Sequence, residues 1–167
     1  MWKVTARPIP KNDFLASQRT KHSFRDALSA PLSKPTLTAA KAQLSIFSHM
    51  PNWVNTLMSI RNKIVKYFGF KVGTTTSLEM KKTDLKLGDA AGFMTVISVN
   101  EHEVISFAED KHMQFYMSVT TDEQRATVST LVNLKTPIGR LYMALITPFH
   151  WVIARAVIHN AVKEQRL

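Results

Sequence analysis

The chain has 167 residues, the length of one ordinary domain with a substantial core. It contains no cysteine, which excludes disulfides, thiolate catalysis and cysteine-ligated zinc or iron–sulfur sites. The formal net charge is +10, and two basic zones, residues 1–35 and residues 61–86, contribute +5 each. These zones suit an anionic partner, such as nucleic acid, a lipid surface or an acidic ligand. They equally suit a solvated basic face that aids solubility.

The first part of the chain combines a tail, a strand and a helix. Residues 1–18 carry prolines and scattered charges without a period, so we interpret them as a flexible tail before a single domain at 19–167. Charges stand where a signal peptide needs an apolar run, so we expect a cytoplasmic protein. Lys21–Ser29 is predicted to be the first strand. A helix capped by Thr36 or Thr38 follows and ends near Met50.

A second helix is predicted over Pro51–Phe68, with Gly69 as its left-handed cap. Its apolar stripe comprises Trp53, Val54, Leu57, Met58, Ile60, Ile64, Val65 and Phe68. Arg61 lies in the middle of this stripe, where a guanidinium must find an anion or reach water. It is therefore an anchor for the carboxylate or phosphate of a hydrophobic ligand, a side chain that snorkels, or a structural partner of Asp89, Glu109 or Asp110.

The second half of the chain changes to a period of two. Four strands are predicted, at Phe93–Val99, His102–Glu109, His112–Thr120 and Arg125–Leu134, and their short connections require antiparallel neighbours. Residues 70–91 are basic and rich in Thr and Lys, and leave room for one or two short strands. If two-residue turns connect the first three of these strands, the register places the following side chains on one face of the sheet: Phe93, Thr95, Ile97, Val99, Val104, Ser106, Ala108, Met113, Phe115, Met117 and Val119.

The last predicted element is a long helix over Pro137–Val162, bent near Pro148. The side expected to face the sheet carries Leu141, Tyr142, Leu145, Ile146, Phe149, Val152, Ile153, Ala156 and Val157. The other side carries Met143, Trp151, Ala154 and Ile158, which we expect to form a homodimer or to cover the mouth of a cavity. Only 14 uncharged residues separate Arg140 from Arg155, fewer than the roughly 20 of a membrane span, so no span is expected.

Together these elements predict an α+β fold, a curved antiparallel sheet of about six strands wrapped around a long C-terminal helix, with two helices after the first strand. This order resembles the helix-grip fold of the START-like (SRPBCC) superfamily, in which the sheet and terminal helix enclose a ligand cavity. Three blocks also resemble a bacterial family known only as a domain of unknown function: PNWVNTLMSIRNKIVKYFG, EDKHMQFYMSV and TPIGRLYMALITPFHWVIARA. The resemblance covers most of residues 22–160. It implies a fold and a ligand-binding class of function, but no catalysed reaction.

We expect the protein to bind a hydrophobic small molecule or lipid between sheet and terminal helix, acidic if Arg61 anchors it. The expected ligand-binding residues are Arg61, Trp53, Leu57, Met113, Phe115, Met117, Tyr142 and Phe149. No catalytic residue, cofactor or metal site is identified, because the histidines are scattered and HExxH, GxSxG and phosphate-binding loops are absent. His112 is interpreted as a surface partner of Glu109. The rival interpretations are an enzyme using the same cavity, a basic membrane-surface protein and, less well supported by the sparse aromatic residues, a nucleic-acid binder.

Overall fold

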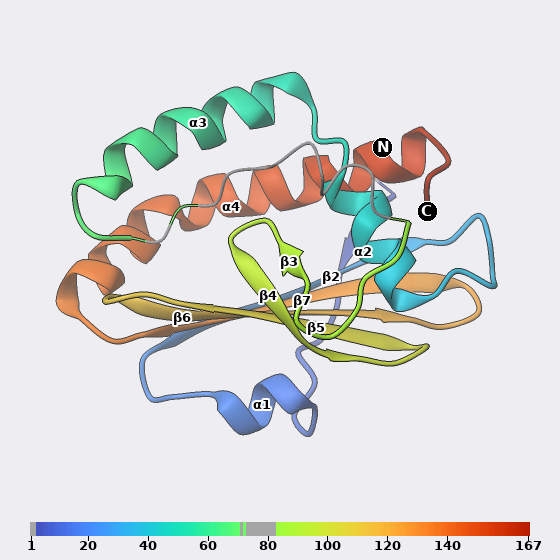
Figure 1. Ribbon diagram of the computed structural model, residues 1–167, viewed down its shortest axis with the longest axis horizontal. Coiled ribbons are helices and arrows are strands. Elements are labelled where there is room, and N and C mark those ends of the chain that lie inside the picture. The colour runs from blue at the N-terminus through green and yellow to red at the C-terminus, as the bar shows by residue number, and fades with distance from the viewer. Residues whose placement is uncertain (1–2, 71, 73–82) are drawn as a thin grey trace.

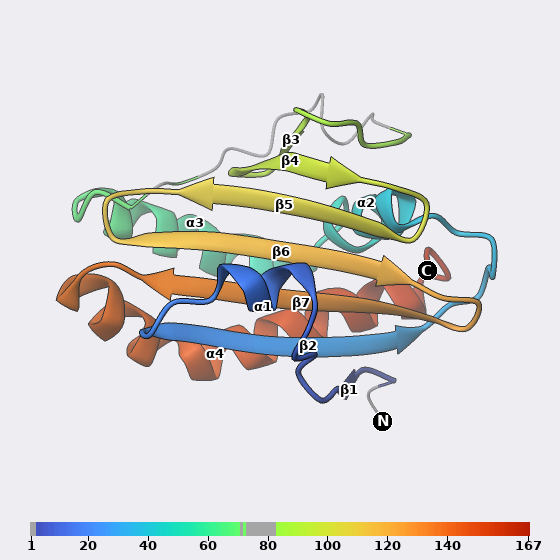
Figure 2. The same ribbon diagram turned by 90° about the horizontal axis from the view of Figure 1, so that it is seen from below.

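The structure is a computed structural model that describes residues 3–70, 72 and 83–167. Its strands are β1 (Thr5–Ala6), β2 (Ser23–Pro31), β3 (Ala90–Ala91), β4 (Met94–Val99), β5 (Glu103–Glu109), β6 (Met113–Thr121) and β7 (Arg125–Leu134). Its helices are α1 (Phe14–Gln18), α2 (Ala39–Phe47), α3 (Asn52–Lys66) and α4 (Pro137–Lys163). The strands form one curved antiparallel sheet in the order β1-β2-β7-β6-β5-β4-β3. Helices α2, α3 and α4 lie over one face of this sheet, and α1 lies on the other (Figures 1 and 2).

The expected α+β architecture, with an antiparallel sheet and a long C-terminal helix, is confirmed. Within the described residues the sheet has seven strands, not six, because the two-residue strands β1 and β3 extend its edges. Such short strands carry no alternating pattern that a sequence could reveal. Of residues 70–91, where short strands were expected, the structure shows β3, whereas residues 71 and 73–82 lie outside the described residues.

The segment interpreted as a flexible tail contributes secondary structure to the outer face of the sheet. Of residues 1–18 the structure describes 3–18, and these include β1 and α1. Asp13 caps α1 by accepting a hydrogen bond from the Ala16 backbone N–H, and its carboxylate also pairs with the Arg25 guanidinium. Leu15 is fully buried in a cluster with Tyr116 and Leu131. Helix α1 therefore covers part of the face opposite α2, α3 and α4, whereas β1 extends the edge of the sheet.

The inward face of β4 differs from the prediction. Thr95 and Ile97 were expected to face the core, but both are exposed, whereas Met94 and Val96 are buried. The pairing of β4 with β5 shifts by one residue between Val96 and Ser98. A bulge of this kind adds one residue to a strand and reverses the faces on one side of it. The expected faces of β5 and β6 are correct, because their register is regular.

The faces of α4 are also largely reversed with respect to the prediction. Met143 and Ile158, expected on the outer side, are 5% and 3% exposed and pack into the core. Leu141, Leu145 and Phe149, expected to face the sheet, are each 63% exposed. Ala156 and Val157, also expected on the sheet side, are buried as predicted. Because α4 is apolar around most of its circumference, its own sequence does not select the side that packs.

By length and composition alone α4 could cross a membrane, although only 22% of its most apolar 18-residue window is buried in this fold. In the structure α4 runs along the sheet and adds Met143, Val157, Ile158 and Ala161 to the packed core (Figure 1). Leaving the sheet would expose these four side chains, so the absence of a span stays our prediction.

Candidate functional site

A large cavity lies between the inner face of the sheet and the helices α2, α3 and α4. Its volume is about 1270 Å³, above the ~300–1,000 Å³ typical of small-molecule sites. The sheet supplies its floor, which includes Ala108, Phe115, Met117 and Val132. Helices α3 and α4 supply its sides, and exposed side chains on both helices show that it opens to solvent. A cavity of this size and composition can hold a long apolar molecule.

Helix α3 forms one side of the cavity while burying very little of itself. Only Val54 and Val65, one near each end, are buried among its described residues. The positions between them leave Leu57, Ile60 and Ile64 41–56% exposed, although the sequence predicted a buried stripe there. The helix starts after Pro51 and ends at Lys66, and Gly69, with a φ of 80°, closes the turn that follows in the expected left-handed conformation. The α3 side of the cavity is therefore apolar and accessible.

Arg61 and Tyr142 meet at the wall of this cavity. Arg61 Nε donates a hydrogen bond of 2.6 Å to the Tyr142 hydroxyl, and its Cζ lies 5.5 Å from the centre of the Tyr142 ring. Its NH1 atom donates to Asn62 Oδ1 at 2.8 Å. The bond to Tyr142 joins α3 to α4, and the two bonds together leave further guanidinium donors without an acceptor among the described residues. A tyrosine hydroxyl that accepts from arginine can still donate its own proton to a ligand.

The structural ion pair considered for Arg61 is not formed within the described part of the chain. Glu109, one suggested partner, instead accepts a 3.0 Å hydrogen bond from Lys135 Nζ. This hydrogen bond lowers the pKa of Glu109 below its ordinary value. No described carboxylate, Asp89 and Asp110 included, pairs with Arg61. Arg61 is thus half-buried, and among the described residues its hydrogen-bond partners are the neutral side chains of Tyr142 and Asn62.

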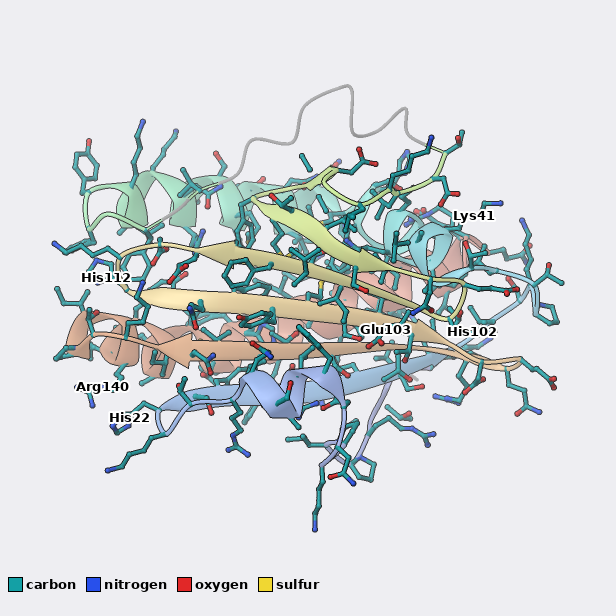
Figure 3. The ribbon with its side chains drawn as sticks, turned by 60° about the horizontal axis from the view of Figure 1, so that its bottom comes forward. His22, Lys41, His102, Glu103, His112 and Arg140 are labelled. Carbon is teal, nitrogen blue, oxygen red and sulfur yellow. The ribbon has the colours of Figure 1, made fainter. Side chains whose placement is uncertain are left out.

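His112 lies where α3 ends and α4 begins, next in the chain to Met113, which lines the cavity. It was interpreted as a surface partner of Glu109, but it is only 2% exposed. Its Nδ1 lies 2.8 Å from Thr136 Oγ1, and its Nε2 lies 2.5 Å from the Phe68 carbonyl oxygen. Phe70 stacks between its ring and the Tyr142 ring, with centroid distances of 4.6 and 4.5 Å. Figure 3 places His112 at the same end of the sheet as Arg140 and His22, and His102 at the other end.

A second polar group lies on the floor of the cavity, under α4. His150 Nε2 is 3.0 Å from Asp26 Oδ2, and the two side chains are 22% and 17% exposed. Asp26 pairs with Thr130 on β7, and Thr130 pairs with Met117 on β6, so the three side chains share the inner face. An ion pair or hydrogen bond of this kind beside an apolar floor is a possible contact for a polar group of a ligand.

Comparison with known proteins assigns the chain to a family. The family model described as "Protein of unknown function (DUF2867)" matches residues 19–157. The chain belongs to this family. No curated protein and no solved structure gives a match. The expected membership of a family of unknown function is thereby confirmed, and the matched residues include every cavity residue from Asp26 to Val157.

Seven of the eight ligand-binding residues expected from the sequence line the cavity: Arg61, Leu57, Met113, Phe115, Met117, Tyr142 and Phe149. Trp53 does not line it and stands 46% exposed at the start of α3. The sequence indicated the apolar ones through the period of their strands and helices, and Arg61 as a charge within an apolar stripe.

The sequence reasoning missed Asp26, Thr130 and Gln43. Asp26 stands at an inward position of β2 between Phe24 and Leu28, and an acid at such a position is the signal that could have revealed it. Gln43 Nε2 donates to Ser106 Oγ at 3.1 Å across α2 and β5, a contact that depends on packing rather than on local pattern.

Proposed function

We propose that this protein binds a hydrophobic molecule with an acidic head group, such as a fatty acid or a related lipid, in the cavity between sheet and α4. The observation that carries this proposal is the position of Arg61. Its guanidinium borders a large apolar cavity and has no described carboxylate to neutralise it. A half-buried arginine with unused donors is well suited to bind a carboxylate or phosphate in a fork geometry.

The shape of the fold supports the same class of function. A long C-terminal helix lies along a curved antiparallel sheet (Figure 1). A cavity lies between them. On this arrangement we base the finer fold proposal, a helix-grip fold of the START-like (SRPBCC) superfamily. The proposal includes a cytoplasmic location and requires neither a cofactor nor nucleic acid.

The contacts at the cavity wall indicate how the ligand would lie. The carboxylate would accept from the N–H groups of Arg61 that have no acceptor among the described residues, and from the Tyr142 hydroxyl, which together would neutralise its charge and fix its orientation. The chain would extend over the floor, along Phe115 and Met117. Burial of each CH₂ contributes about 0.8 kcal/mol, so a long chain supplies most of the affinity and Arg61 supplies the preference for an acid.

A competition experiment with matched ligands tests this proposal. The protein is stripped of bound lipid and loaded with the fluorescent fatty acid cis-parinaric acid, which is then displaced by oleic acid or oleyl alcohol. These competitors have the same chain and differ only in the head group. We expect both to displace the probe and oleic acid to do so at about tenfold or more lower concentration, because only oleate carries the charge that Arg61 matches.

Two variants locate the binding in this cavity. Ala108→Trp places a large ring on the cavity floor and is expected to reduce probe binding severely. Ala144→Trp makes the same change at an exposed position of α4 outside the cavity and is expected to leave binding unchanged. If the wild-type protein fails to bind cis-parinaric acid, or both variants bind equally well, the cavity is not the site of such a function.

The second candidate function is an enzyme that acts on a hydrophobic substrate in the same cavity. The contact between Asp26 and His150 favours it, because a carboxylate that orients an imidazole is a common arrangement for a general base. It ranks second because, among the described residues, no hydroxyl group is hydrogen-bonded to His150. Native mass spectrometry of a ligand that co-purifies, before and after long incubation, would reveal turnover by a change of mass that His150→Phe abolishes.

A further inference from the structure

The rim of the cavity is an apolar surface built from two helices. We define the rim as Ile60, Ile64 and Phe68 at α3, and Leu141, Leu145 and Phe149 on α4. All six border the cavity, and their exposed fractions range from 50% to 63%. Soluble monomers rarely leave so many large apolar side chains together in water. The rim therefore indicates a surface that something else covers.

The charges of the two helices are of one sign. Within its bounds α3 carries Arg61, Lys63 and Lys66, and α4 carries Arg140, Arg155 and Lys163, and neither helix holds an acidic residue. Lys63 and Lys66 are exposed and border the cavity beside the apolar rim. Next to Phe68 in the chain, Tyr67 adds an aromatic side chain that is 91% exposed. Apolar, basic and aromatic side chains together are typical of a surface that lies in the interface of an anionic membrane.

A second copy of the chain fits this surface less well. An isologous dimer through the rim would bring α3 and α4 of one copy against basic helices of the other. Neither helix offers a carboxylate within its bounds to offset those charges. Like charges brought together across an interface oppose association, whereas anionic head groups neutralise them.

We propose that the rim docks on an anionic lipid bilayer, with the rim side chains in the head-group region and Lys63 and Lys66 against lipid phosphates. Helix α4 stays on the sheet, because Val157, Ile158 and Ala161 on its opposite side belong to the packed core. In this position the open side of the cavity faces the acyl chains, so a lipid-like ligand can pass between bilayer and cavity without crossing water. This last step rests on the proposed function, whereas docking itself is independent of any cavity ligand.

Vesicle flotation with the full chain tests the docking. Vesicles of phosphatidylcholine alone are compared with vesicles containing 30% phosphatidylglycerol, at low and high salt. We expect binding to the anionic vesicles, at least tenfold weaker on phosphatidylcholine alone and weakened by salt.

Matched variants identify the surface. Leu145→Asp changes a rim residue that is 63% exposed, and Leu87→Asp makes the same substitution at a residue that is 69% exposed and lies outside the cavity lining. We expect Leu145→Asp to lose vesicle binding at least tenfold and Leu87→Asp to retain it. Lys63→Gln with Lys66→Gln should weaken binding by about tenfold or more. Circular dichroism and thermal unfolding verify that each variant is folded.

Several results would overturn the docking. These are absence of wild-type binding to anionic vesicles, equal binding to neutral ones, and equal loss in Leu145→Asp and Leu87→Asp. A solution dimer that Leu145→Asp dissociates would assign the rim to a second copy instead. If docking succeeds while cis-parinaric acid fails to bind, the proposed ligand function fails and the membrane surface stands. The reverse pattern overturns the membrane surface alone.

Discussion

His112 joins the end of α3 to the start of α4 through the carbonyl oxygen of Phe68. That oxygen can only accept, so the Nε2 atom 2.5 Å away carries the proton. In the neutral imidazole Nδ1 is then an acceptor, and the Thr136 hydroxyl donates to it. Thr136 Oγ1 in turn accepts from the Gly139 backbone N–H as the cap of α4. A continuous chain of hydrogen bonds thus connects the two helices that frame the cavity.

We expect His112→Leu to destabilise the fold by about 1–3 kcal/mol, because it leaves the Phe68 carbonyl and the Thr136 hydroxyl without this partner. Urea unfolding measures the loss, and hydrogen exchange should show faster opening at the C-terminal turn of α3. His102→Leu serves as control, since His102 is exposed at the opposite end of the sheet. Equal stability of the two variants would show that His112 is not the connection.

Gly139→Ala tests the close approach of α4 to β6. A methyl group at Gly139 would lie 2.7 Å from the His112 carbonyl oxygen, which is part of the backbone and is held by the Lys135 N–H. Inside an unconstrained helix this change would stabilise by roughly 1 kcal/mol. Here we expect a loss of about 1–3 kcal/mol in urea unfolding, because the helix start must shift. An increase in stability would contradict the close contact.

Much of the fold could be predicted from local patterns, and its departures have physical causes. The sequence locates α3 within a few residues, because Pro51 and Gly69 bound an amphipathic stretch. The inward face of β4 could not be predicted, because the bulge depends on its pairing with β5. Residues 13–18 lack the length for a helical period, so α1 is visible only through its Asp13 cap.

The apolar residues of the candidate site could be predicted from the sequence, whereas the contacts between its polar side chains could not. Arg61 and Tyr142 were found separately, yet their 2.6 Å contact joins residues 81 positions apart and requires the fold. The orientation of α4 decides which side chains line the cavity and which pack. A helix apolar on nearly every side offers no local signal for that choice, so Leu145 and Phe149 were expected on the sheet and lie at the rim.

The contact of Asp26 with His150 yields a prediction for a double-mutant cycle. Asp26→Leu and His150→Leu each remove one partner and leave the other in a partly buried position, so each should cost about 1–3 kcal/mol. The double variant leaves no stranded polar group and should lose less than the sum of the two. Urea unfolding of the four proteins gives the coupling energy. Additive losses would show that the two side chains are energetically independent despite their 3.0 Å separation.

Arg61→Met separates a ligand anchor from a structural arginine. Among the described residues Arg61 bonds to the neutral side chains of Tyr142 and Asn62, so its removal strands no described carboxylate. We therefore expect the free energy of unfolding to change by less than about 1 kcal/mol, since Met also suits the apolar surroundings. In Arg61→Met the binding free energy for oleic acid should weaken by about 2–5 kcal/mol relative to the wild type. The affinity for oleyl alcohol should stay the same.

Lys63→Met is the matched control for Arg61→Met, because it removes the same charge two residues further along α3. A general electrostatic attraction for oleate would be weakened equally by both variants, whereas a specific anchor is lost only in Arg61→Met. A stability loss of about 3–5 kcal/mol in Arg61→Met would instead show that Arg61 neutralises a carboxylate of the protein itself. Thermal unfolding and displacement of cis-parinaric acid are both measured on Arg61→Met and Lys63→Met, so stability and affinity can be compared directly. The anchor is supported only if Arg61→Met keeps its stability and selectively loses oleic acid binding.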